Sequence, residues 1–125
     1  MTLPFLERDV LAAVYRRSAL LLQTADAEGF GLPVAEAMAC GCPVVASDLP
    51  VLREVGGPAT AYCPVADIAA WQETVIRLLR ERRQQPEVWA LRSNQAVTHA
   101  ARFCWSENAR QTARIYRNVH AEVPR

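Results

Sequence analysis

Two glutamates, separated by seven residues, flank a glycine-containing turn in the first third of the chain. Glu28 precedes the turn Gly29-Phe30-Gly31, and Glu36 follows it. Glycine lets the backbone turn tightly and approach a ligand closely. If a helix begins just after this turn, its first N–H groups lack partners within the helix, and phosphate or sugar oxygens can accept from them. The segment is therefore typical of a cradle for an anion or a polyol.

The second glutamate has a separate use in such a cradle. Glu36 would lie about five residues into the helix, roughly 7 Å along its axis from the turn. A carboxylate there can accept from two ribose hydroxyls, as acidic residues do in dinucleotide-binding domains. Glu28 would face the other side of the phosphates, where it could bind sugar hydroxyls or stabilise positive charge at an anomeric carbon. Gly-x-Gly turns before helices are common, however, so a simple structural turn is the alternative.

The elements around the turn predict an α/β unit. The apolar run 19–22 is typical of a strand buried on both faces. A compact helix is expected over 32–40, ended by Gly41, because glycine tolerates the left-handed conformation that follows many helices. A second buried strand is expected over 43–46. This strand–helix–strand order indicates a parallel sheet with a right-handed crossover.

The flanking segments are predicted to be mainly helical. An amphipathic helix is expected over 7–17 with Asp9 as its cap, a short helical segment over 51–55 and a last strand over 59–63. Three further helices are expected, opened by Asp67, Pro86 and Ser106. Their predicted buried faces are Ile68, Trp71, Val75, Leu78 and Leu79 in the first, and Ala109, Thr112, Ala113, Tyr116 and Val119 in the last.

Composition excludes several classes of protein. The 125 residues suit one domain or a large piece of one, and 14 basic against 13 acidic residues give a net charge of +1, which is far from the basic footprint of a nucleic-acid binder. No apolar stretch approaches the roughly 20 residues of a membrane span. The four cysteines (Cys40, Cys42, Cys63 and Cys104) lack the spacing of a zinc site, so we expect reduced thiols and a cytoplasmic protein.

The central segment resembles a known motif. Residues 28–46, with Ser47-Asp48 and 52–55, closely resemble the E-x7-E region of retaining glycosyltransferases of the GT-B fold, the large family 4 group. Residues 103–106 followed by Tyr116 are similar to that family's closing segment, as residues 11–16 are to an earlier one. The resemblance implies a partial Rossmann-like α/β domain with a short parallel sheet and C-terminal helices. Residues 1–125 would be the C-terminal part of a nucleotide-sugar-binding domain.

The resemblance also implies roles for individual residues. The intact enzymes transfer a hexose from a nucleotide-sugar donor (a UDP-, GDP- or ADP-sugar) to an acceptor with retention of configuration, usually without a metal or other cofactor. Glu28 matches the motif's first glutamate, which is associated with the donor sugar, and is the expected catalytic residue. The expected substrate-binding residues are Gly29, Phe30, Gly31 and Leu32, through their backbones, and Glu36 at the ribose.

The sequence departs from the family pattern in two places beside the motif. Gln23-Thr24 stands where Pro-Ser is common, and Asp26-Ala27 precedes the glutamate where an aromatic residue is frequent. We expect these differences to affect the choice of sugar rather than the class of reaction. His99 and His120 fall on late helices away from the motif, and we predict both to be surface residues.

Several parts of such an enzyme find no match in this sequence. The acceptor domain and the upstream glycine-rich turn with basic residues that neutralise the diphosphate are absent, and the candidate cations Arg8, Arg16, Arg17 and Arg53 are not at matched positions. We therefore expect a truncated fragment that is inactive alone and that lacks its N-terminal domain. The alternatives are a non-catalytic nucleotide- or sugar-binding module and one subunit of a split enzyme. Any membrane contact would be peripheral and made through the full enzyme.

Overall fold

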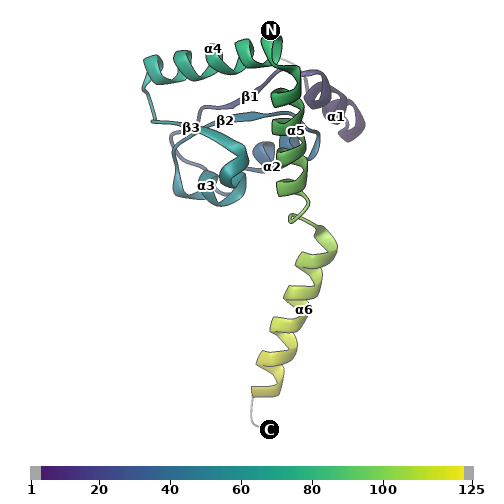
Figure 1. The fold of residues 1–125 in the computed structure, drawn as a ribbon. Coiled ribbons are helices and arrows are strands. Elements are labelled where there is room, and N and C mark those ends of the chain that lie inside the picture. Colours follow the sequence, from purple (N-terminus) through teal and green to yellow (C-terminus); the bar gives the residue numbers. More distant parts are fainter. Residues whose placement is uncertain (1–3, 123–125) are drawn as a thin grey trace.

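Three short parallel strands form the centre of the computed structural model, which describes residues 4–122 (Figure 1). The strands are β1 (Leu21–Gln23), β2 (Val44–Ser47) and β3 (Thr60–Cys63), in the order β1-β2-β3. In their register Leu22 pairs with Val45, and Val45 pairs with Ala61. The predicted α/β class with a short parallel sheet and C-terminal helices is confirmed.

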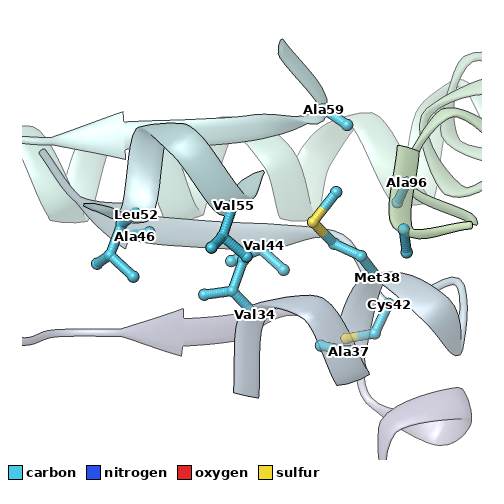
Figure 2. Close-up of a cluster of buried hydrophobic side chains, with 11 residues drawn as sticks. Val34, Ala37, Met38, Cys42, Val44, Ala46, Leu52, Val55, Ala59 and Ala96 are labelled. Carbon is cyan, nitrogen blue, oxygen red and sulfur yellow. The ribbon is translucent and has the colours of Figure 1, made fainter. Parts of the chain in front are cut away.

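One face of the sheet carries the main hydrophobic core (Figure 2). The helices on this face are α2 (Leu32–Ala39), α3 (Pro50–Gly56) and α5 (Pro86–Ala100), and a 3-10 turn, η1 (Gly57–Ala59), follows α3. Because side chains alternate along a strand, Val44 and Ala46 of β2 point into this core. Their buried partners are Val34, Ala37, Met38, Cys42, Leu52, Val55, Ala59, Ala96 and Ala100. The core thus fixes α2, the helix that follows the glycine turn, against the central strand.

The opposite face of the sheet is covered mainly by α4 (Ile68–Gln84), and Trp89 of α5 also packs against the cluster there. Val45 and Cys63 pack there with Leu78, while Ile68 at the start of α4 is 80 % exposed. Leu22 of β1 lies level with Val45 and is 46 % exposed. The prediction that the first strand is buried on both faces is therefore wrong, because α4 covers β3 and β2 and leaves the β1 side open.

Two helix starts differ in how well the sequence predicted them. Asp67 caps α4 as expected, since its Oδ1 accepts from the Ala70 N–H at 3.0 Å. Asp9 was predicted to cap the first helix, but α1 (Arg8–Arg17) has Glu7 at that position. Asp9 lies within the first turn, where its carboxylate accepts from the neighbouring Val10 N–H. It therefore adds a favourable charge at the helix start rather than a cap.

The last helix, α6 (Trp105–Glu122), extends away from the rest of the molecule (Figure 1). It begins one residue before Ser106, so the predicted cap is wrong, and Ser106 Oγ instead lies 2.8 Å from Cys104 Sγ. The predicted inner face is also wrong: Tyr116 is 73 % exposed and Val119 is 55 % exposed. The heptad-like spacing is present, but no other described element lies beside the helix. Within residues 4–122 no helix combines the length and hydropathy that a membrane span requires.

Candidate functional site

The glycine turn lies at the carboxyl edge of the sheet. β1 ends at Gln23 and α2 begins at Leu32, so the connection between them carries the first glutamate and both glycines. Gly31 has φ +92° and immediately precedes α2. A Cβ on Gly31 would lie 2.8 Å from Leu52 Cδ2, and Leu52 is fully buried. The turn therefore needs glycine at this position for two reasons, the left-handed backbone and the close approach of α3.

The first turn of α2 leaves a backbone donor available. No side chain caps the helix, and Pro33 contributes no N–H. The N–H groups of Val34 and Ala35 bond the Gly31 carbonyl oxygen at 3.0 and 3.3 Å. Among residues 4–122 the Leu32 N–H has no such partner, and it lies at the positive end of the helix dipole. The chemistry of this arrangement suits an oxygen of an anionic ligand.

The carboxylate of Glu28 is held by its own chain. Glu28 is half-buried, and its Oε2 accepts from Gln23 Nε2 at 2.9 Å. Its Oε1 accepts from the Gly29 N–H, also at 2.9 Å. Sequence reasoning noted Gln23 only as a departure from the family pattern and missed this contact. A polar residue at the end of β1, five residues before Glu28, was the available signal.

Glu36 is exposed on α2 and is contacted by another helix. The Tyr15 hydroxyl on α1 donates to Glu36 Oε2 at 3.3 Å. Burial of the phenol, reinforced by the negative charge of Glu36, raises the pKa of Tyr15 to about 12. Tyr15 therefore stays neutral near pH 7 and remains a donor to this carboxylate. The sequence gave no sign of this contact, which joins residues 21 positions apart.

The predicted site residues lie along one segment, from the end of the β1–α2 connection into α2. Glu28, the turn and Leu32 share the sheet edge, and Glu36 lies one turn further along α2. The role predicted for Phe30 and Leu32 involves their backbones and not their side chains. Both side chains are about half exposed. The ring of Phe30 contacts Phe103, with centroids 5.9 Å apart and planes at 83°. Sequence reasoning did not predict this aromatic pair.

Arg53, the candidate cation that lies on α3, is already engaged. Arg53 forms an ion pair with Asp48, in which Nη2 lies 2.8 Å from Oδ2, and its guanidinium stacks 4.7 Å from the centre of the Tyr62 ring. This hydrogen bonding lowers the pKa of Asp48. The remaining candidates, Arg8, Arg16 and Arg17, all lie on α1, and within the described range none of them forms an ion pair.

Two other predictions concern histidine and cysteine. His120 is exposed, as predicted, but His99 is half-buried and its Nε2 lies 3.0 Å from the Val55 carbonyl oxygen, so the surface prediction for His99 is wrong. It packs against η1, where Gly57 leaves room for the ring. All four cysteines are free thiols. In the part of the chain that the structure describes, no three His, Cys, Asp or Glu side chains gather as a metal site would require.

Curated proteins are similar in sequence to most of this chain. D-inositol 3-phosphate glycosyltransferase from Frankia alni is 38 % identical over 111 residues, which cover 87 % of this chain and 26 % of that protein. Phosphatidyl-myo-inositol mannosyltransferase from Mycobacterium leprae is 39 % identical over 95 residues, which cover 74 % of this chain and 24 % of the relative. The chain therefore spans about a quarter of the length of these curated relatives.

A solved structure shares the fold. Sucrose-phosphate synthase from Thermosynechococcus elongatus superposes with a TM-score of 0.80 at 28 % identity, over 92 % of this chain and 29 % of that one. The family model described as "Glycosyl transferases group 1" matches residues 1–95, which include the glycine turn, both glutamates and the whole sheet. This chain belongs to the group 1 glycosyl transferases.

Proposed function

We propose that residues 1–125 form the C-terminal part of the nucleotide-sugar-binding domain of a retaining GT-B glycosyltransferase. The observation that carries this proposal is the uncapped N-terminus of α2, which follows the glycine turn with a glutamate on either side. Backbone donors, a helix dipole and two carboxylates at different depths match the three parts of a nucleotide sugar. These parts are a diphosphate, a ribose and a hexose.

Each part of the donor has a partner of suitable chemistry in this arrangement. Diphosphate oxygens would accept from the Leu32 N–H and the turn backbone. Ribose hydroxyls would donate to Glu36, whose Oε1 remains available while Oε2 accepts from Tyr15. The hexose would lie beside Glu28. As the bond between the anomeric carbon and the diphosphate breaks, its electrons leave with the nucleoside diphosphate, and the Glu28 carboxylate stabilises the positive charge that develops on the sugar.

The leaving group explains why we propose that the chain is inactive alone. A departing diphosphate needs strong electrostatic stabilisation. Arg53 is paired with Asp48, so its charge is partly neutralised already. We propose that the missing cations and the acceptor site come from an N-terminal domain, either in the same polypeptide or in a partner subunit. The donor would be a UDP-, GDP- or ADP-sugar, and any contact with a membrane would be peripheral and made through that complete enzyme.

A chimera tests this function directly. The 111-residue matched segment of the Frankia alni relative is replaced by the corresponding segment of this chain, and sugar transfer is measured with common nucleotide sugars and the relative's own acceptor. We expect transfer with retained anomeric configuration, determined by NMR of the product. Glu28→Ala in the chimera should lower kcat and kcat/KM together, while the free nucleoside diphosphate still binds, because the interaction is made chiefly in the transition state.

Three results would contradict all or part of the proposal. A chimera that is folded by circular dichroism and monodisperse, yet binds neither a nucleotide sugar nor a nucleoside diphosphate, would show that this segment is not a donor site. Loss of nucleoside diphosphate binding in Glu28→Ala would instead move Glu28 from the sugar to the nucleotide. Donor binding without any transfer would favour the alternative of a non-catalytic binding module.

A further inference from the structure

The end of α5 and the turn after it contact both the end of α3 and the glycine turn, which are distant from it in sequence. His99 lies with Nε2 3.0 Å from the Val55 carbonyl oxygen, and Arg102 Nη2 donates to the Glu54 carbonyl oxygen at 2.6 Å. Both acceptors belong to the last turn of α3, where helix carbonyls lack partners within the helix. A side chain in the last turn of α5 and one in the turn that follows it therefore satisfy carbonyl groups at the C-terminal end of α3 and hold the two helix ends together.

Phe103 is the next residue after Arg102, and three aromatic or cationic groups surround its ring. Its ring is 6.3 Å from the His99 ring, at 68°, and the Arg102 guanidinium carbon lies 4.8 Å above it. The third neighbour is Phe30 in the glycine turn, whose ring is 5.9 Å away and nearly perpendicular. Because His99 and Arg102 are themselves bonded to α3, Phe103 offers Phe30 a fixed surface.

The glycine turn has few other restraints. Gly29 is exposed, and a Cβ added there would meet nothing within 4 Å. Glu28 bonds within its own loop and to the end of β1, and no side chain caps α2. Phe30 lies between the two glycines, which are the residues with the greatest backbone freedom. Gly31 lies close to Leu52 of α3 through its backbone, and the contact of the Phe30 ring with Phe103 adds a side-chain restraint between this part of the turn and the end of α5.

We infer that Phe103 is a positioning residue that holds the turn in its donor-binding shape through the ring of Phe30. This inference rests on the proposed function for its catalytic consequence, but not for its structural one. A fixed turn presents the Gly31 and Leu32 backbone to the diphosphate in advance, so the ordering cost is not incurred on binding. Removing the aromatic contact should weaken donor binding while the chemistry of a bound donor changes little.

Hydrogen exchange of the 125-residue chain tests the structural part without any donor. In Phe103→Leu we expect the amides of residues 28–32 to exchange about two- to tenfold faster, in line with the strength of an edge-to-face aromatic pair. Phe103→Tyr keeps the ring and should restore slow exchange. Trp105→Leu is the matched control, because Trp105 is an aromatic residue two positions away that is 83 % exposed; it should leave the turn unchanged. Phe30→Leu should reproduce the effect from the other side of the pair.

Kinetics of the chimera described above test the catalytic part. Phe103→Leu should raise donor KM by about two- to tenfold with little change in kcat, and Phe103→Tyr should restore KM. The inference is overturned if exchange of residues 28–32 is the same in Phe30→Leu, Phe103→Leu and the unsubstituted chain, or if Trp105→Leu matches Phe103→Leu. If the turn responds to these variants while the unsubstituted chimera binds no donor, the proposed function fails and the positioning contact stands.

Discussion

The two glutamates of the candidate site differ in their surroundings, and this difference is consistent with the separate roles that we propose for them. Both oxygens of Glu28 accept hydrogen bonds from the chain, so its orientation is fixed before any ligand arrives. Glu36 is exposed and has one oxygen bonded to Tyr15. The sequence indicated both glutamates because the motif is local. It could not indicate Gln23 or Tyr15 as their partners, since those contacts depend on where β1 and α1 lie.

Glu36 should act mainly on donor binding. Glu36→Gln removes the charge from its hydrogen bonds to ribose, each worth roughly 1.5–3 kcal/mol, so we expect donor KM in the chimera to rise by a factor of about ten to a hundred. Initial-rate kinetics at saturating acceptor would measure this change. Glu73→Gln, on the exposed face of α4, is a charge-matched control that should have no effect. An unchanged donor KM with a collapse of kcat would contradict the assignment.

At the scale of elements, the sequence predicted best where local signals suffice. The helix over 32–40 and the strand over 43–46 were placed within one residue, because Gly41, with φ +74°, ends the helix and the strand is apolar throughout. Burial was predicted less well. The apolar residues of β1 and α6 have the expected spacing, but whether they are covered depends on elements that local sequence does not describe.

Gly31 should contribute to the stability of the strand–turn–helix unit as well as to its function. Gly31→Ala places a Cβ against buried Leu52 at φ +92°, and we expect a loss of about 1–3 kcal/mol in the free energy of unfolding. Gly29→Ala is the control, because it meets open space. Urea denaturation of both variants at one protein concentration, followed by circular dichroism, measures the difference. Equal midpoints for the two variants would show that Leu52 moves aside freely.

At the scale of the whole molecule, helices cover the two faces of the sheet unequally. One face of the sheet is closed by α2, α3 and α5, whereas α4 leaves a hollow of about 520 Å³ beside β1, with Leu22, Ile68, Trp71 and Val75 in its wall. Within the described residues, β1 is an edge strand of the sheet. A strand edge with open N–H and C=O groups beside apolar surface is a ready site for association. In the relatives, about three quarters of the polypeptide lies outside the matched segment.

We therefore expect the isolated chain to self-associate. At micromolar concentration, residues 1–125 should elute as an oligomer in size-exclusion chromatography with light scattering, or bind the dye ANS, and should transfer no sugar from common nucleotide sugars. Leu22→Lys, which places a charge on the open β1 surface, should shift the chain toward monomer, because desolvating that charge would oppose association. Glu73→Lys serves as the control for added positive charge. A cooperatively melting monomer that transfers sugar would contradict both the expected self-association and the proposal that the chain is inactive alone. Such activity would require a complete phosphate-binding site within these 125 residues.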